Sequence, residues 1–206
     1  IKENLPSGLH LNNDKKKIGT ISDRVQPQKT GTTATQLLKF DYLGYEFKVD
    51  QAIANSGGNK KHGQYNRPVA VDIAASKVKK IKTRIVKSFL DYKVNKDWPL
   101  LLDRIKFLTE NFSVFNHNAG GRRLAGIYHS YPQVPDSSPA LRDLDFFLKN
   151  AVLSNKGRVF SMTAPHLNQK QRRVLLARIF ARGHAEKTFV HFTAQRISDI
   201  QSCWNK

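Results

Sequence analysis

Cations gathered on one side of a predicted helix are the most chemically informative feature of the sequence. From Ala75 to Tyr92 the apolar residues recur every three or four positions, which predicts an amphipathic helix with Ser76 as its N-cap. The opposite side has no carboxylate before Asp91. Its six cations are Lys77, Lys79, Lys80, Lys82, Arg84 and Lys87. Such a run is often only a solvated surface, but its single sign favours binding to phosphates, which would offset the mutual repulsion.

The charge balance of the whole chain supports the same interpretation. The 206 residues include 35 Lys and Arg against 16 Asp and Glu, a formal net charge of +19. A surface of this kind attracts a polyanion, either nucleic acid or an acidic membrane face. No apolar run approaches the roughly 18 residues that a membrane span needs, and no secretory segment opens the chain, so we expect no membrane partner.

Established catalytic and metal-binding patterns are missing. The sequence has no nucleophile elbow, phosphate loop or dinucleotide motif, and its seven histidines never take the spacing of zinc ligands. Cys203 is the single cysteine, which excludes a disulfide framework and fits a reducing, cytoplasmic compartment. Asp143 and Asp145 are separated by about 200° around a predicted helix, so they cannot share a metal ion, and we expect both to be solvated.

The elements that position these residues can be read from the hydrophobic pattern. The sequence predicts an α+β, predominantly α fold, with a small β-containing part over residues 1–70 and an all-helical bundle over 71–206. A hairpin is expected in 37–49, with its turn at Leu43 and Gly44. The other expected elements are a strand at 69–73, helices at 97–112, 139–153, 168–182 (followed by Gly183) and 193–204, and a basic loop around 119–123.

Two short motifs resemble the closing part of the polymerase domain in reverse transcriptases. Gly8 to Lys15 (GLHLNNDK) resembles the GLxLNxxKT element that follows the catalytic Tyr-x-Asp-Asp strand in retron, group II intron and related bacterial enzymes. Phe40 to Phe47 (FDYLGYEF) is similar to their FxFLGYxF hairpin, the primer grip. The two motifs occur in the family's order. Lys16 departs from the pattern, because the family usually has Thr there.

Apart from the loops at 19–36 and 50–70, which match nothing in the family, the rest of the chain resembles the α-helical thumb and C-terminal extension of bacterial abortive-infection reverse transcriptases. The segments that carry this resemblance are KKIKTRIVKSFLDY, LLLDRIKFLTENF, LAGIYHSYP, LRDLDFFLKN and ISDIQSCW. The resemblance implies part of an RNA-directed DNA polymerase of antiphage defence, with an RNA template, which can be a dedicated non-coding RNA, and a DNA product. It leaves open whether further protein subunits or an oligomer take part.

The resemblance also implies Mg²⁺ as cofactor. In such enzymes two Mg²⁺ ions, held by palm aspartates, activate the primer 3′-oxygen and the departing pyrophosphate. This chain has no Asp-Asp dipeptide. The metal ligands and the fingers and palm would therefore lie outside the chain, which we do not expect to be an enzyme on its own.

Individual residues acquire roles from the same resemblance. Lys15 would lie near the incoming triphosphate, where a cation neutralises or protonates the leaving pyrophosphate; from spacing alone it is an ordinary loop lysine. The primer-grip turn would consist of Tyr42, Leu43, Gly44 and Tyr45, whose glycine allows the backbone to approach the primer. The six helix cations would hold phosphates without reading sequence. Further phosphate candidates are Arg122, Arg123, Arg172 and Arg173.

Two other functions remain open. A stand-alone basic RNA- or DNA-binding module needs only the cationic surface, and a group II intron maturase-like fragment would share the motifs. Because the chain opens on Ile1 and its only methionine is Met162, we expect a processed product, a fragment or the visible part of a longer protein. A Tyr-x-Asp-Asp sequence encoded upstream of Ile1 would favour the polymerase. A start codon at that place would favour the stand-alone module.

Overall fold

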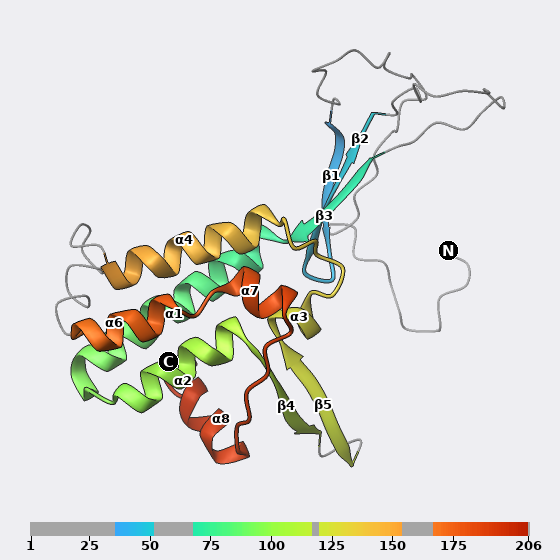
Figure 1. Cartoon of the computed structure of the whole chain (residues 1–206). Helices are drawn as coiled ribbons and strands as arrows, with labels where there is room; N and C mark the ends of the chain where they lie inside the picture. Colours follow the sequence, from blue (N-terminus) through green and yellow to red (C-terminus); the bar gives the residue numbers. More distant parts are fainter. Residues whose placement is uncertain (1–35, 52–67, 117–119, 154–166, 206) are drawn as a thin grey trace, which may run out of the picture. The chain divides into compact units, whose positions relative to one another are not determined.

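The computed structural model describes residues 36–51, 68–116, 120–153 and 167–205. Within these ranges the strands are β1 (Gln36–Tyr42), β2 (Tyr45–Asp50), β3 (Val69–Ile73), β4 (Asn111–Asn116) and β5 (Gly121–Gly126) (Figure 1). The helices are α1 (Ala75–Asn95), α2 (Trp98–Thr109), α3 (Ile127–Ser130), α4 (Pro139–Leu153), α6 (Gln169–Leu176), α7 (Phe180–Ala185) and α8 (Ala194–Gln201). The predicted α+β, predominantly α fold is confirmed. The first motif, with Lys15, lies outside the described residues.

The chain divides into two compact units, and the β1–β2 hairpin contributes to both. The described part of the first unit comprises residues 36–42, 46–51 and 68–70, while the hairpin turn, Leu43–Tyr45, belongs with the second unit, which continues from Val71. Strands β1, β2 and β3 form one sheet in that order. Leu43 and Gly44 have φ angles of 49° and 89°, as a two-residue turn between twisted strands requires, so the predicted turn is confirmed.

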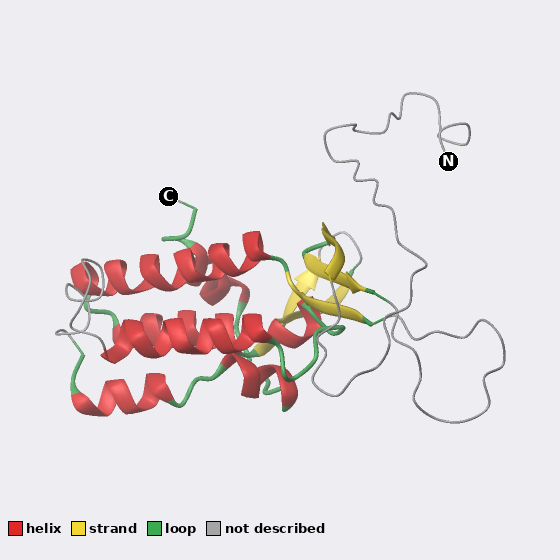
Figure 2. Cartoon of the chain, turned by 90° about the horizontal axis from the view of Figure 1, so that it is seen from above, coloured by secondary structure: helices red, strands yellow, loops and turns green. Residues whose placement is uncertain are grey.

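Helices with one apolar stripe each build the core of the second unit. α1 packs against α2 and α4, α4 packs against α6 and α7, and α2 packs against α8 (Figures 1 and 2). Ile85, Leu101, Leu144 and Leu175, from four of these helices, are completely buried. Among the described residues, no helix has both the length and the apolar character to cross a membrane.

Side-chain caps mark the start of three helices at the predicted positions. Asp97, Asn168 and Thr193 each accept a hydrogen bond from the backbone N–H three residues further on. Such a cap satisfies one of the free N–H groups of the first turn. The N-cap predicted at Ser76 is wrong. Helix α1 follows Ala74, whose own N–H donates to the Gly44 carbonyl at 2.9 Å, and no side chain caps it.

The bundle expected to be all-helical over 71–206 also contains a second sheet, so that expectation is wrong. The helix expected over 97–112 ends at Thr109, and β4 pairs with β5 in an antiparallel ribbon that includes part of the predicted loop at 119–123. The start of β4 is held by the buried side chain of Asn111, which donates to the carbonyl oxygens of Gly183 and Thr188. Because these partners are distant in sequence, local spacing contains no sign of them.

The helix predicted over 168–182 is two helices, α6 and α7. The carboxylate of Asp145 on α4 accepts the N–H groups of Phe180 and Ala181, at 2.5 and 3.2 Å, and so caps a new helix there. Gly183, expected to follow the helix, lies inside α7. The expectation that Asp145 is solvated is also wrong: it is half-buried, and burial raises its pKa although the two N–H donors act in the opposite direction.

Candidate nucleic-acid interface

Three of the six predicted cations on α1 are exposed at its N-terminal half. They are Lys77, Lys79 and Lys80, and we call them the α1 strip. None of the three forms an ion pair with another residue in the part of the chain that the structure describes. Because their charges are not neutralised nearby, they are available to phosphate groups.

The other three cations of α1 contact the rest of the helical unit. Lys82 pairs with Asp143 of α4 at 2.7 Å. The Arg84 guanidinium lies 5.0 Å from the centre of the Trp204 ring, and Lys87 donates to the Trp204 carbonyl at 3.2 Å. These contacts attach α4 and the C-terminal segment to α1. The continuous six-cation surface expected from the sequence is therefore reduced to the α1 strip.

The predicted primer-grip turn lies beside the α1 strip. The Gly44 carbonyl accepts the Ala74 N–H just before α1, and a Cβ at Gly44 would be 3.2 Å from Cε of Lys77. Tyr42 and Leu43 are exposed. Gly44 thus adjoins the first lysine of α1, and both belong to the second unit, whereas Tyr42 belongs to the first.

Tyr45 has a different environment from Tyr42. Its ring packs edge-on against Tyr131, with 5.8 Å between the ring centres. Burial raises the pKa of Tyr131, with Tyr45 as a further cause. Tyr131 was not among the candidates from the sequence, where an aromatic residue after a short helix has no distinguishing spacing. Tyr131 packs against the Tyr45 ring and so supports the turn. Tyr45 therefore helps to orient the turn and is less suited than Tyr42 to contact a ligand.

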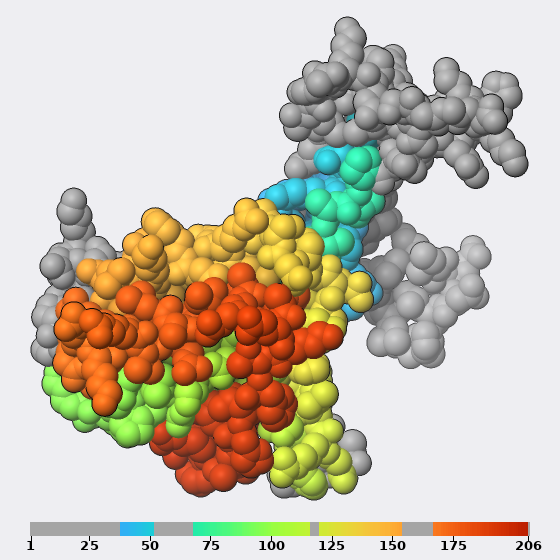
Figure 3. Space-filling view, viewed as in Figure 1, coloured from blue at the N-terminus to red at the C-terminus, as the bar shows by residue number. Residues whose placement is uncertain are grey.

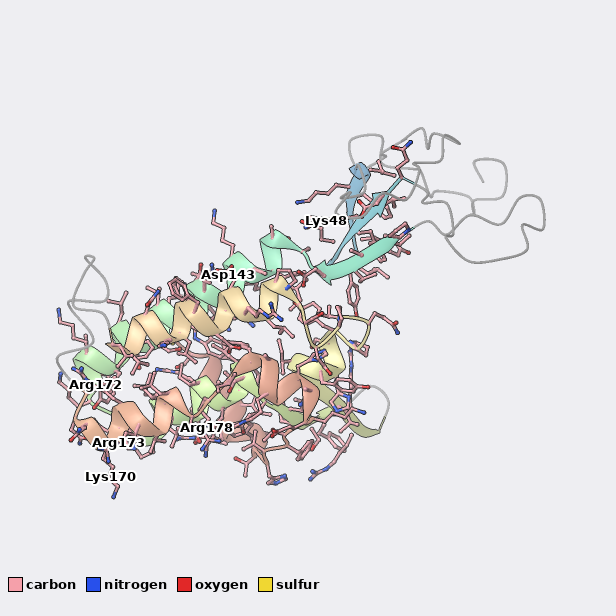
Figure 4. All side chains as sticks on the ribbon, turned by 45° about the horizontal axis from the view of Figure 1, so that its top comes forward. Lys48, Asp143, Lys170, Arg172, Arg173 and Arg178 are labelled. Atoms are coloured by element: carbon pink, nitrogen blue, oxygen red, sulfur yellow. The ribbon has the colours of Figure 1, made fainter. Side chains whose placement is uncertain are left out.

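The additional arginine candidates lie on other elements. Arg122 and Arg123 are exposed on β5, where Arg122 donates to the Ser113 hydroxyl at 3.2 Å. Arg172 and Arg173 lie on α6, which packs against α4 (Figure 4). Since α6 and β5 are separate elements from α1, the structure does not gather the six predicted cations and these four arginines into one site.

A cavity of about 360 Å³ lies between α4 and the α6–α7 segment. Its apolar lining comprises Phe146, Leu148, Leu175, Leu176 and Ile179, and its polar lining Asp145, Lys149 and Arg178. Asp145 is engaged in capping α7, and Arg178 pairs with Glu110 at 2.6 Å. The cavity therefore presents an apolar surface with cations at its margin and no arrangement of nucleophile and base.

The described residues do not fit the two-magnesium site that the resemblance implies. Among them, no group of three or more His, Cys, Asp or Glu side chains is placed to hold a metal ion. The exposed groups that the structure brings together are cations and backbone, which bind phosphate by charge and hydrogen bonding. Phosphate binding is therefore the chemistry that these groups support.

Similarity to known proteins adds no constraint on the function. The chain matches no protein-family model, no curated protein and no solved structure. The features that bear on its function are its own residues and their arrangement, above all the α1 strip and the turn beside it.

Proposed function

We propose that the second unit binds the sugar-phosphate backbone of a nucleic-acid duplex through the α1 strip, as the thumb and primer grip of a bacterial antiviral-defence reverse transcriptase. The duplex would be primer and template, an RNA template paired with its DNA copy. The catalytic fingers and palm, with their Mg²⁺ ions, would be supplied by residues outside this chain. The complete enzyme would act in the cytoplasm.

The observation that carries this proposal is the position of the Gly44 turn against Lys77. A glycine at positive φ lets a phosphate chain approach the backbone closely. Three lysines that form no ion pair among the described residues follow within the first two turns of the adjacent helix. Lysines on a helix hold phosphates as point charges and read no base sequence. A polymerase needs this kind of contact, because it must hold every sequence that it copies.

The duplex proposal is tested by removing the α1 strip. Lys77, Lys79 and Lys80 are changed together to Ala, and the affinity of the 206-residue chain for an RNA–DNA hybrid is measured against salt concentration. We expect weaker binding and a log–log salt slope flatter by up to about three, since each phosphate contact contributes roughly 0.9. An unchanged slope would contradict the proposal.

A matched control removes the same charge elsewhere. Lys149 and Lys170 are exposed on α4 and α6 and can be changed to Ala, while Lys96, at φ 56°, is better changed to Asn, which tolerates this conformation. This triple variant has the same net charge as the strip variant. We expect its salt slope to change by less than about one, because non-contacting charges act only at long range.

The polymerase part of the proposal is tested in the complete enzyme at Lys15. Changing Lys15 and Lys16 together to Ala should slow nucleotide addition and leave duplex affinity nearly unchanged, because a cation at the pyrophosphate acts on charge that develops in the transition state. The α1-strip variant should show the reverse: weaker binding with normal single-nucleotide addition at saturating duplex. Addition by the double variant at the parent's rate would contradict the assignment of the first motif.

A stand-alone basic RNA- or DNA-binding module is the second candidate. One observation favours it: the exposed lysines of the α1 strip and Gly44 beside Lys77, which are the proposed phosphate contacts, all come from this chain and need no palm. Both candidates predict the same salt slope. A Tyr-x-Asp-Asp sequence encoded upstream of Ile1 would support the polymerase, and a start codon there would support the module.

A further inference from the structure

The cavity between α4 and the α6–α7 segment has no role in the function proposed above. Figure 3 shows the surfaces of these elements side by side, and α4 packs against both α6 and α7. The cavity volume of about 360 Å³ is more than twice the roughly 150 Å³ that holds benzene in an engineered protein cavity. It also falls in the usual range of small-molecule sites. The cavity is therefore large enough for an organic ligand.

The floor of the cavity is apolar and buried, whereas its rim is exposed. Leu148 of α4 and Leu175 of α6 line the cavity and belong to the buried core. Phe146 and Ile179, which line it as well, are 65% and 38% exposed. Exposed apolar side chains that continue into a buried apolar lining give a ligand both an entrance and a surface to bury. The apolar part of a ligand would therefore lie against the two leucines.

Arg178 lines the cavity with most of its hydrogen-bonding capacity unused. A guanidinium carries five N–H donors on three nitrogens. Among the described residues, Nη1 is the only one of these nitrogens with an acceptor, the carboxylate of Glu110 at 2.6 Å. The Nε atom is buried and has no partner there. Since buried donors in folded proteins nearly always have an acceptor, Arg178 can still serve an acceptor that a ligand brings.

Lys149 adds a positive charge at the rim. It lies one helical turn after Asp145 on α4, is exposed, and forms no ion pair with another described residue. The oxygens of Asp145 already accept the N–H groups of Phe180 and Ala181, and Glu110 neutralises Arg178. The lining thus has one cation without a partner, which matches a ligand of one negative charge. A phosphate monoester carries about −1.5 to −2, so a carboxylate fits better.

We propose that this cavity binds a small amphipathic monocarboxylate, such as a medium-chain fatty acid. Its hydrocarbon part would lie on Leu148, Leu175 and Leu176, and Lys149 and the unused donors of Arg178 would hold its carboxylate at the rim. A nucleobase fits less well, because it presents donors as well as acceptors, whereas the cavity offers cationic donors and a carboxylate engaged in capping α7.

The test titrates decanoate, below the concentration at which it forms micelles, into the 206-residue chain in a calorimeter. We expect one decanoate to bind per chain. Lys149→Glu should lower the affinity about tenfold or more, because an attraction at the rim becomes a repulsion. The matched control is Lys170→Glu, the same charge change at an exposed residue of α6 that points away from α4 (Figure 4). The control should bind decanoate within about twofold of the parent.

A series of ligands tests the apolar part of the cavity. From hexanoate to octanoate to decanoate, each added CH₂ should raise the affinity by up to about fourfold, the usual effect of burying one such group. Decyltrimethylammonium, which has the same chain and a positive head, should bind at least about tenfold more weakly than decanoate.

Three results would overturn the proposal. The first is a parent chain that does not bind decanoate. The second is an equal affinity in Lys149→Glu and Lys170→Glu, which would mean that only the net charge of the chain attracts the ligand. The third is an affinity that does not depend on chain length, which would mean that the hydrocarbon part stays outside the cavity.

Discussion

Lys79 and Lys82 are the same residue type on the same helix, yet the structure places them in different situations. Lys79 is exposed without an ion pair among the described residues, whereas Asp143 neutralises Lys82 at 2.7 Å. Asp143 itself is exposed, as the sequence predicted, so this pair contributes little to stability, in the usual range of about 0–1 kcal/mol. Its larger effect is on the charge that α1 offers to a ligand.

Removing that carboxylate should therefore strengthen nucleic-acid binding. In Asp143→Ala, Lys82 loses its partner and becomes available beside the α1 strip. We expect tighter hybrid binding and a salt slope steeper by about one, because one more phosphate contact becomes possible. Titrations of parent and variant at several salt concentrations measure this. In the Asp143→Ala, Lys82→Ala double variant the gain should disappear, and a gain that persists would show that Lys82 is not the cause.

Asp145 shows how the surroundings of a carboxylate determine its pH dependence. Burial raises its pKa, so the folded protein holds the proton more tightly than the unfolded chain, whose carboxyl titrates near 4. Its contribution to the free energy of unfolding is therefore complete below about pH 4 and declines as the pH rises through the folded-state pKa. Asp145→Asn removes this titration but keeps one oxygen acceptor for the N-terminus of α7.

We expect the cost of Asp145→Asn to shrink as the pH rises from about 4 to 7. At the acid end the variant should be less stable by up to about 1 kcal/mol, the usual value of a helix cap, because an NH2 group, which cannot accept, replaces the oxygen that faces the Ala181 N–H. Urea unfolding of parent and variant across this pH range gives the difference. A cost that instead grows with pH would mean that the ionised carboxylate is stabilised in the folded protein.

At the scale of elements, the spacing of apolar residues predicts a helix well when the side chains that the helix buries lie along one stripe. The bounds of α4, 139–153, agree with the prediction because its buried residues recur at helical spacing. The start and turn of the hairpin were also predictable, since Leu43 and Gly44 separate two apolar runs.

The elements that the sequence did not predict depend on distant partners. α7 begins where Asp145 of another helix supplies its cap, and β4 begins where Asn111 bonds to Gly183 and Thr188. The candidate site follows the same rule. The lysines of α1 were found by spacing, but their division into exposed and neutralised sets depends on Asp143 and Trp204, which are contributed by α4 and the C-terminal segment.

The close approach of α7 to the end of α2 gives a prediction at this scale. A Cβ on Gly183 would lie 1.9 Å from the Thr109 carbonyl oxygen, so Gly183→Ala must separate the two elements. Overpacking of this kind costs typically about 1–3 kcal/mol, and we expect a loss at the upper end, because the obstacle is backbone. Ala185→Ser, at an exposed position of the same helix, should cost less than about 1 kcal/mol. Urea unfolding compares them, and equal costs would contradict this account of Gly183.

For the whole molecule, the net charge of +19 couples stability to salt and to nucleic acid in opposite directions. Without a ligand, like charges destabilise the folded chain, and salt screens them over a Debye length of about 10 Å at 0.1 M. Salt should therefore raise the melting temperature of the free chain. With nucleic acid bound, salt also weakens the complex, because the released counterions return to a more concentrated solution.

We expect the melting temperatures with and without an RNA–DNA hybrid to converge as salt rises from about 50 to 200 mM. At about 100 times the dissociation constant, the hybrid stabilises the folded chain by about 2.7 kcal/mol, roughly 5–10 °C for a chain of this size. Three phosphate contacts then weaken binding about 40-fold over this salt range, which leaves about 0.7 kcal/mol, or about 2 °C. The α1-strip variant should show a small difference that hardly depends on salt. Curves for the parent chain that stay parallel would mean that the hybrid is held by contacts other than the phosphates.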